Sequence, residues 1–455
     1  MAGMSASSGS SEAASAGAAP ETSAAMAAAA GEAQAFGTTP RSRSLLDRGL
    51  GPLTVGGVRH SMLTLCSTAL GGGVLSIAYV MKLTGIALGC LLLLISAVLA
   101  FASISSLMRM CMVTGKHTYA AVFSHCAGPR AGPVLDAMLF TFGMGSCIGY
   151  LVFIGDFVPA IASMFGASWD HEVVRDAAIA GAAVLILPLA LAKDISVLRY
   201  ISPVSICALF YMAAVVSIGC PYQFQQHMNS KEYGSVSFFN VDTQFFEAFA
   251  LCIFAFNCHL NVVPVAASMV SPSKARIRKV SYRVNALQFA FYCLIGVTGY
   301  LSFLSTTKSD ILLDYDASNK FVAGGRIMLT CTMMVGLPVN LHPTMRSGLQ
   351  IVDYFRGRDT PTTRPFAPRA AMTITCVIIQ ALVAIKVPNV GDVLGLLGGS
   401  VATAMMFVIP AYCMRIILPR TKKHRVFEAM LWFFALVGFA SVPIKVLRLA
   451  GAMPQ

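Results

Sequence analysis

The fold of this chain is decided by two interruptions in its apolar runs, LGGGV at residues 70–74 and FAFNCHLN at residues 254–261. The interrupted runs have the length, about 20 residues, at which a helix rising about 1.5 Å per residue crosses about 30 Å of hydrocarbon. Each glycine in a row of three weakens a helix by about 1 kcal/mol. Asn257, His259 and Asn261 of the second run are followed by Pro264, and these residues also interrupt a helix. We therefore expect two discontinuous membrane-spanning helices.

Apolar runs of similar length continue from Arg59 to the end of the chain, and we count eleven. They lie near residues 59–82, 85–112, 133–165, 175–192, 199–219, 243–270, 281–305, 321–342, 368–387, 390–415 and 426–449. The interrupted runs are the first and the sixth and cross in opposite directions, which is typical of a five-plus-five inverted repeat. The sequence therefore predicts an all-α membrane protein with a transmembrane domain at 59–450. Its repeats are expected at about 59–219 and 243–415, with an extra C-terminal helix at about 426–449.

The composition excludes several classes of protein. Of the 455 residues, 56% are hydrophobic and 12% are charged, whereas about a quarter of the residues in a soluble domain are charged. Nearly all of the 13 cysteines lie in or beside apolar runs, which excludes a disulfide-framed secreted protein. The net charge of +13 belongs mostly to loops that flank the membrane, so no nucleic acid partner is expected.

The basic residues indicate the orientation of the chain, because Lys and Arg near helix ends stay on the cytoplasmic side. When the loops are counted alternately, 24 of the 33 Lys and Arg residues lie on the side of the N-terminus and 9 on the other side. We therefore expect a cytosolic N-terminus and, after eleven spans, an extracellular or lumenal C-terminus. Residues 1–58 are expected to form a disordered cytosolic tail, since the first forty are rich in Ala and Ser and contain no Lys or Arg.

The two breaks predict a ligand site. Unwound backbone at the membrane midplane needs partners for its N–H and C=O groups, and an amino acid supplies complementary groups. The amides at the positive end of the following half-helix are expected to bind a carboxylate, and the carbonyls of the second break an ammonium. The amides are those of Gly71, Gly72 and Gly73, and the carbonyls belong to Ala255, Phe256, Asn257 and Cys258. Close helix packing is the alternative explanation for the glycines.

Three motifs resemble those of the amino acid/auxin permeases, a family of the amino acid–polyamine–organocation superfamily. GGGVLSIAY at 71–79 is similar to the first-helix signature of the family, and FAFNCHLNVVP at 254–264 is similar to its sixth-helix signature. LPVNLHPTMR at 337–346 resembles the end of its eighth helix. The resemblance covers about residues 55–450 and implies eleven helices with a site shaped by helices one and six.

The resemblance also implies a function, secondary active transport of amino acids by alternating access. The substrate stays open between cationic amino acids (arginine or lysine) and small neutral ones. A coupling proton or the membrane potential is favoured as driving force, and sodium coupling is an alternative. An amino-acid-sensing receptor with the same fold is an alternative function. The expected partners are the amino acid, the proton and membrane lipid, with the plasma membrane favoured over an acidic organelle membrane.

Asp156, Glu247 and His259 are titratable side chains that fall within the predicted spans. A carboxylate inside a membrane is costly unless it faces water or a cation. Asp156 and Glu247 can therefore receive a cationic substrate or a coupling proton, or lie in an aqueous vestibule. His259 can relay a proton or satisfy carbonyls that the break sets free.

The first helix also bears on the coupling ion. Sodium-coupled relatives carry N-x-x-x-G-x-G in this helix, and their Asn contributes to the sodium site. Ser67 stands at the aligned position here, which favours a proton over sodium. Hydroxyl groups still bind sodium, so Ser67, Thr330 and Thr332 are the candidate ion site. No metal site, cofactor or enzymatic activity is expected, because the other histidines scatter to helix ends and loops without HExxH or Cys/His spacing.

Overall fold

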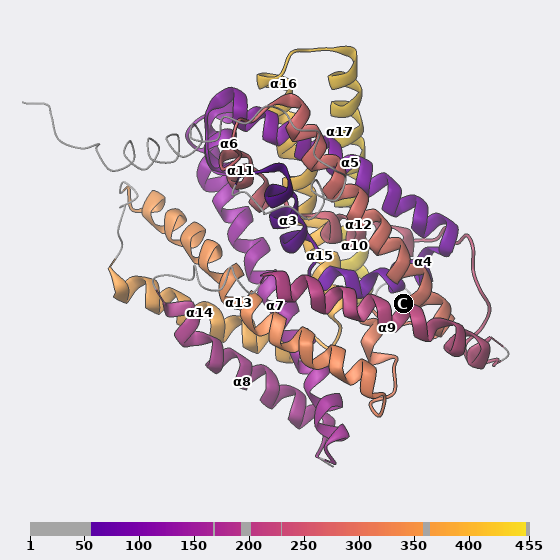
Figure 1. Cartoon of the computed structure of the whole chain (residues 1–455). Coiled ribbons are helices and arrows are strands. Elements are labelled where there is room, and N and C mark those ends of the chain that lie inside the picture. The colour runs from indigo at the N-terminus through magenta and orange to yellow at the C-terminus, as the bar shows by residue number, and fades with distance from the viewer. Residues whose placement is uncertain (1–55, 167–168, 193–201, 229, 358–364, 452–455) are drawn as a thin grey trace, which may run out of the picture. The chain divides into compact units, whose positions relative to one another are not determined.

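The chain is helical in the computed structural model, which describes residues 56–166, 169–192, 202–228, 230–357 and 365–451 (Figure 1). No strand occurs within these ranges. Thr54–Gln455 forms one compact unit. The tail expected at 1–58 lies outside the described residues except for its last three positions.

Two spans are broken where the sequence predicts it. The first consists of α3 (Val58–Ala69) and, after a bend of 57°, η1 (Gly72–Ser76) with α4 (Ile77–Thr84). The sixth consists of α10 (Gln244–Phe256) and α11 (His259–Ala267). We call the face of this unit at which α3 begins the Val58 face. The opposite face, at which α4 ends, is the Thr84 face.

The remaining spans are continuous helices or nearly so. They are α5 (Ile86–Thr114), α7 (Ala131–Met164), α8 (His171–Leu191), α9 (Ser202–His227), α12 (Lys274–Phe303), α13 (Lys320–Phe355), α14 (Phe366–Lys386), the tenth span from α15 (Val390–Leu397) to α16 (Ile409–Ile417), and α17 (Lys422–Leu449). Ten helices in the described part are long and apolar enough to cross a membrane, and the bent first pair makes eleven. The predicted multi-pass helical fold is confirmed.

Polar caps set where several spans begin. Asn319 accepts hydrogen bonds from the amides of Phe321 and Val322 at the start of α13. Thr421 accepts one from the amide of His424 at the start of α17. Such caps satisfy amides that have no partner inside the helix, so the spans start at defined residues.

Some features of the helices differ from the sequence pattern. α13 continues through Pro338 and Pro343 to Phe355, well beyond its apolar run. Proline removes one N–H from a helix, but contacts with neighbouring helices hold such a helix together in a membrane protein. The pattern also gives no sign of the short helix α6 (Tyr119–Ala127). Nor does it reveal the two π-helical turns of the tenth span, η5 (Gly398–Ala402) and η6 (Ala404–Val408).

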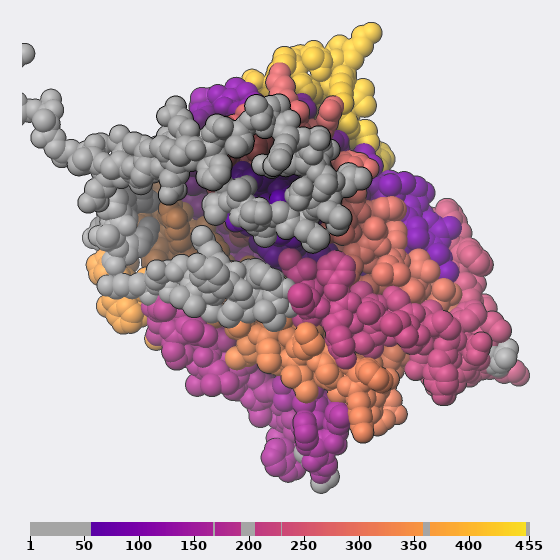
Figure 2. All heavy atoms as spheres, viewed as in Figure 1, coloured from indigo at the N-terminus to yellow at the C-terminus, as the bar shows by residue number. Residues whose placement is uncertain are grey.

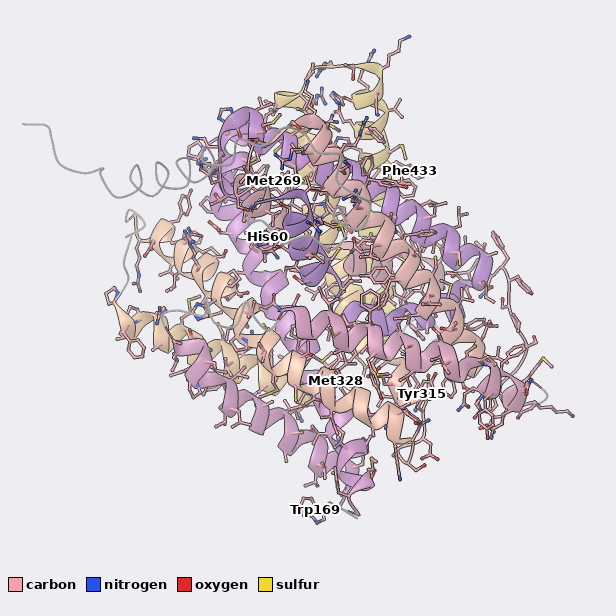
Figure 3. All side chains as sticks on the ribbon, in the orientation of Figure 1. His60, Trp169, Met269, Tyr315, Met328 and Phe433 are labelled. Carbon is pink, nitrogen blue, oxygen red and sulfur yellow. The ribbon has the colours of Figure 1, made fainter. Side chains whose placement is uncertain are left out.

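The broken spans lie in the middle of the bundle, and apolar side chains cover its periphery. Every residue from Glu247 to Ile253 in α10 is buried, and α10 packs against α4, α15 and α17 (Figure 1). Phe433 of α17 and Trp169, which precedes α8, project outward (Figure 3) and are exposed. Atoms of the magenta α9 and the orange α13 reach the surface drawn in Figure 2. An apolar exterior around a buried broken span suits a chain surrounded by lipid.

Candidate functional site

A cavity of about 150 Å³ lies between the two breaks and extends from them toward the Val58 face. Its wall on that side comes from α3 and α11, the half-helices that lead from the breaks to the Val58 face. A smaller cavity of about 60 Å³ adjoins it. The residues that line both are Thr68, Gly71, Gly72, Phe142, Tyr150, Asn257 and Asn340.

Most of the predicted binding residues lie at these cavities. Gly71, Gly72 and Asn257 line both, Cys258 lines the larger one, and Gly73 and Ala255 line the smaller one. Phe256 lines neither cavity, because its side chain is fully buried with its ring against Tyr292. The structure therefore brings the two breaks to one place, while the role of each residue in binding stays a prediction.

The first break leaves two backbone donors without a partner. The amide of Gly71 donates to the carbonyl of Ala69 at 3.0 Å, and the amide of Val74 donates to the carbonyl of Gly71 at 3.2 Å. The amides of Gly72 and Gly73 have no acceptor within the described residues. They stand at the start of η1, where the helix dipole is positive. A carboxylate fits this position.

The three glycines serve two purposes. A Cβ atom on Gly72 would lie 2.6 Å from the ring of Phe153, and one on Gly73 would lie 3.3 Å from the Cα atom of Ala255. Close packing therefore favours glycine at both positions, strongly at Gly72 and more weakly at Gly73, where the contact is only tight. A Cβ atom on Gly71 would make an ordinary contact of 3.4 Å with the hydroxyl of Tyr150, on the wall of the cavity. Gly71 is thus the glycine at which a side chain would intrude on a ligand with little disturbance of the fold.

The second break leaves carbonyl acceptors without a donor. The carbonyl of Ala255 accepts from the hydroxyl of Tyr292, and that of Cys258 accepts from the amide of Asn261 at 3.0 Å. The carbonyls of Phe256 and Asn257 have no donor in the described part of the chain. The break therefore presents two free acceptors, and an ammonium group is a suitable partner for them.

Asn257 connects this break with His259. Its Oδ1 atom accepts a hydrogen bond from the backbone amide of His259 at 3.1 Å and lies 3.2 Å from the ring Nδ1 atom. The backbone donor fixes the orientation of the Asn257 amide, so its Nδ2 atom faces away and has no partner within the described ranges. This free donor lies on a residue that lines both cavities.

His259 is fully buried and lines neither cavity. Its Nε2 atom lies 2.9 Å from the hydroxyl of Ser103, which lies 2.6 Å from the carbonyl of Met406 in η6. His259 therefore satisfies polar groups at the break and, through Ser103, connects the sixth span with α5 and the tenth span. A role in relaying a proton stays a prediction.

Asp156 and Glu247 line neither cavity and are bound to basic side chains of the chain itself. The Nε atom of Arg175 lies 3.1 Å from the Oδ1 atom of Asp156, and its Nη2 atom donates to the carbonyl of Val387 at 2.9 Å. Arg175 therefore provides the positive charge beside Asp156, a place at which the sequence also allowed a cationic substrate. The pair links α7, α8 and the end of α14.

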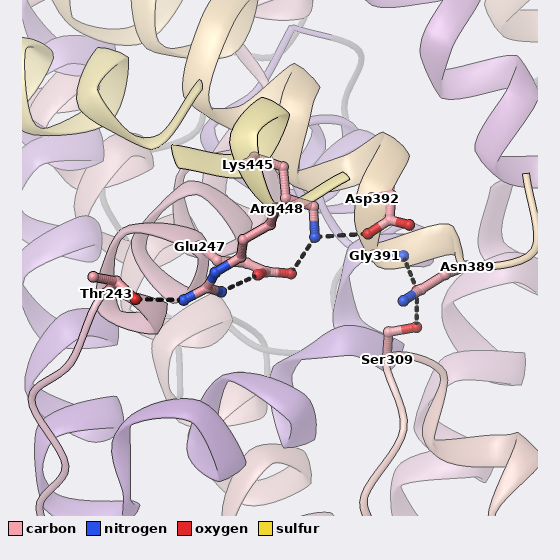
Figure 4. Close-up of polar contacts among 8 residues, drawn as sticks. All are labelled: Thr243, Glu247, Ser309, Asn389, Gly391, Asp392, Lys445 and Arg448. Atoms are coloured by element: carbon pink, nitrogen blue, oxygen red, sulfur yellow. Dashed lines mark hydrogen bonds and ion pairs between the residues drawn. The ribbon is translucent and has the colours of Figure 1, made fainter. Parts of the chain in front are cut away.

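Glu247 belongs to a charged cluster at the Thr84 face, which we call the Lys445 cluster (Figure 4). Lys445 of α17 lies 2.5 Å from Glu247 of α10 and 2.6 Å from Asp392 of α15. Arg448 donates to Glu247 at 3.1 Å and to Thr243 at 2.7 Å. The lysine of the extra C-terminal helix thus joins the sixth and tenth spans on the side away from the larger cavity.

The candidate ion ligands are only partly together. Ser67 and Thr332 line the larger cavity, and Thr330 does not. Each hydroxyl donates to the backbone of its own helix, Ser67 to Thr64 and Thr332 to Met328. No group of three or more His, Cys, Asp or Glu side chains in the described ranges could hold a metal ion.

Several lining residues are not evident from the sequence. Phe142 of α7, Asn261 of α11, and Met333 and Asn340 of α13 lie on the cavity wall. Aromatic and apolar residues in a membrane helix usually pack, so their type alone gives no signal. Asn340 stands between two prolines in the motif at 337–346, and that setting is the one available clue.

Known proteins have sequences similar to that of this chain. The profile of the family described as "Transmembrane amino acid transporter protein" matches residues 54–449. "Putative amino acid transporter AAT1" of Toxoplasma gondii is 33% identical over 66% of this chain and 41% of that protein. "Vacuolar amino acid transporter 5" of Schizosaccharomyces pombe is 26% identical over 78% of this chain and 83% of that protein. The match therefore spans less than half the length of the Toxoplasma protein.

Solved structures share the fold at low sequence identity. A mutant of the Eremococcus coleocola manganese transporter superposes with a TM-score of 0.56, at 13% identity over 92% of this chain and 91% of that chain. MhsT in complex with L-phenylalanine superposes with a TM-score of 0.52, at 13% identity over 84% of this chain and 98% of that chain. These likenesses support the inverted-repeat fold of a transporter.

Proposed function

The chain belongs to the transmembrane amino acid transporter family, the amino acid/auxin permeases, and from this premise we propose that it transports neutral amino acids by alternating access. The observation that carries the proposal is the cavity between the breaks. The amides of Gly72 and Gly73 are free on one side, and the carbonyl of the cavity-lining Asn257 is free on the other. A substrate carboxylate would bind the two amides, and its ammonium would bind the carbonyl of Asn257.

The cavity wall favours a neutral side chain on the substrate. None of the described residues that line either cavity is charged. An arginine or lysine side chain would bring an unpaired charge into this place, and an unpaired buried charge costs several kcal/mol. Asp156, the acid that could receive it, is engaged by Arg175. Phe142, Leu329 and Met333 offer apolar contacts instead.

The orientation of the chain gives the cavity a direction. With the N-terminus in the cytosol, as the basic residues favour, the Val58 face is cytosolic. The cavity extends toward this face, and the Lys445 cluster joins α10, α15 and α17 on the other. The described conformation then faces the cytosol. Substrate entry from outside requires α10 and α15 to separate at the Thr84 face.

A coupling proton is the proposed driving force, because the membrane potential does no net work on a neutral amino acid that moves without a coupled ion. The hydroxyls of Ser67 and Thr332 border the cavity without an acid nearby that could complete a sodium site. His259 is the histidine or acidic residue that lies nearest in sequence to the cavity-lining Asn257 and Cys258. Replacing external sodium by choline should therefore leave uptake intact, and a protonophore should suppress it.

The experiment is uptake of labelled amino acids into vesicles that contain the purified full-length chain. We expect accumulation of labelled alanine or leucine and little of lysine. Binding without accumulation would support the receptor alternative, and preferential lysine uptake would contradict the neutral substrate class. Fluorescent tagging in cells would test the plasma membrane as the location against an organelle membrane.

A further inference from the structure

Two helix ends meet at one side chain, Tyr292 of α12. Its hydroxyl lies 3.1 Å from the carbonyl oxygen of Ala69 and 2.8 Å from that of Ala255. Ala69 is the last residue of α3, and Ala255 is the last but one of α10. One carbonyl therefore comes from each broken span. Tyr292 itself is fully buried and lies outside both interrupted runs.

Both carbonyls lack the partner that a continuous helix would supply. The last four carbonyls of a helix have no intrahelical donor and form its negative end. In an unbroken sixth span, the amide of His259 would donate to Ala255, but it donates to the side chain of Asn257. The hydroxyl of Tyr292 replaces this donor. Its hydrogen is shared at the point where two negative helix ends converge.

The position of Tyr292 relates it to both halves of the cavity. The carbonyl of Ala69 also accepts from the amide of Gly71, next to the free amides of Gly72 and Gly73. Ala255 directly precedes Phe256 and Asn257, which carry the free carbonyls. The ring of Tyr292 stands edge-on to that of Phe256, with the ring centroids 5.1 Å apart. The hydroxyl therefore joins the donor side of the cavity to its acceptor side.

We propose that Tyr292 is a positioning residue of the substrate site. Its hydroxyl ties the end of α3 to the end of α10, and so fixes the distance between the amides that bind the carboxylate and the carbonyls that bind the ammonium. This role rests on the proposed function. In transporters with broken helices, unwound carbonyls and half-helix ends commonly bind a cation. Here a hydroxyl hydrogen links them, so this link needs no bound ion.

The test is Tyr292→Phe, with Tyr300→Phe as matched control. Tyr300 lies on the same helix and is also buried, but its hydroxyl accepts from the amide of Ser237 at 2.9 Å, away from the breaks. Loss of one hydrogen bond that holds the site together should raise the KM of Tyr292→Phe for neutral amino acid uptake about three- to tenfold. The KM of Tyr300→Phe should match the wild type.

Thermal unfolding of the purified variants separates positioning from general stability. Both variants lose a buried hydroxyl, so both should unfold at somewhat lower temperature than the wild type. A lower unfolding temperature with an unchanged KM in Tyr292→Phe would overturn the proposal. Absence of uptake by the wild type would instead contradict the proposed function.

A second substitution covers the case in which Tyr292→Phe does not fold. Incorporation of 3-fluorotyrosine at position 292 keeps the size of the ring and makes the hydroxyl a stronger donor. The KM should then fall below that of the wild type. An unchanged or higher KM in this variant would also overturn the proposal.

Discussion

At the scale of single residues, the three glycines of the first break are not equivalent. Gly72 lies too close to Phe153 to carry a side chain without a shift, and a Cβ atom on Gly73 would be tight against Ala255, whereas Gly71 faces the cavity beside Tyr150. The backbone of Gly71 is extended, with φ of −115°, so other residues can adopt its conformation. Gly71 therefore allows a test of ligand binding that a substitution of Gly72 would confuse with misfolding.

Gly71→Ala should raise the KM for a neutral amino acid about tenfold or more and leave the unfolding temperature nearly unchanged. The added methyl group makes an ordinary contact with Tyr150 but occupies space at the carboxylate position, and small displacements of a bound substrate have large effects. Uptake kinetics of the purified variant check this. The same KM as in the wild type would remove Gly71 from the site. Gly181→Ala is the control, since nothing lies near an added Cβ atom there.

A second prediction at this scale concerns the proton. The hydroxyl of Ser103 has one hydrogen and two close partners, Nε2 of His259 and the carbonyl of Met406. If Ser103 donates to Met406, it can accept only from a protonated Nε2 atom. Because Nδ1 already faces the Oδ1 acceptor of Asn257, the network is fully satisfied when His259 carries both protons. Proton binding at His259 would therefore set the direction of the Ser103 hydroxyl.

Ser103→Ala should weaken accumulation driven by a pH gradient several-fold and preserve exchange of substrate across vesicles. The variant removes the acceptor for the second proton without touching the cavity. Ser106→Ala on the same helix is the control, because its hydroxyl contacts only the sulfur of Met414, at 3.5 Å. If both variants accumulate substrate as the wild type does, His259 is a structural residue.

At the scale of helices, the sequence predicts most of the architecture. The breaks at 70–74 and 254–261 are readable because Gly, Asn and His are costly in the middle of apolar runs. The continuation of α13 past Pro338 cannot be predicted from the sequence, because it depends on the helices that pack around α13. The partner of Asp156 is likewise hidden, since Arg175 lies on another helix and the pairing requires the tertiary fold.

The extra helix α17 is predicted to control opening at the Thr84 face. Lys445 bridges the carboxylates of Glu247 and Asp392, and without it this link between α10 and α15 is lost while Arg448 still pairs with Glu247. Lys445→Met should separate α10 from α15 and let a membrane-impermeant maleimide, added from the Thr84 side, reach Cys258 on the cavity wall. Labelling should be several-fold faster than in the wild type.

Two controls make this labelling specific. Cys258→Ser identifies the signal among the other cysteines, and Lys386→Met replaces an exposed lysine on the same face. Equal labelling of Cys258 in the wild type and in Lys445→Met would show that the Lys445 cluster does not restrict access. A lower unfolding temperature of Lys445→Met is expected as well, since breaking a buried ion pair costs about 3–5 kcal/mol.

At the scale of the whole molecule, the site exists only where the two repeats meet. Hydropathy suffices to predict the spans and the two breaks, because each depends on local sequence, while the orientation inferred from the basic residues stays a prediction. Tyr150 and Asn340 line the cavity and the hydroxyl of Tyr292 binds the two breaks, yet all three belong to helices without any break, so only the packed bundle brings them there. The side chains that would select a substrate are therefore beyond sequence reasoning, whereas the backbone groups that we propose to bind the amino acid are within it.

We propose that free backbone groups of both breaks bind the carboxylate and the ammonium of one neutral amino acid. The most direct measurement is competition against the labelled neutral amino acid that enters vesicles fastest, using its N-acetyl derivative, its methyl ester and its decarboxylated amine. Each derivative keeps the side chain and loses one charged group. We predict that none of the three competes at concentrations at which the unlabelled amino acid blocks uptake completely. Competition by the ester or the amine as strong as that of the amino acid itself would contradict binding of the carboxylate at Gly72 and Gly73. The same result for the N-acetyl derivative would contradict binding of the ammonium at Asn257.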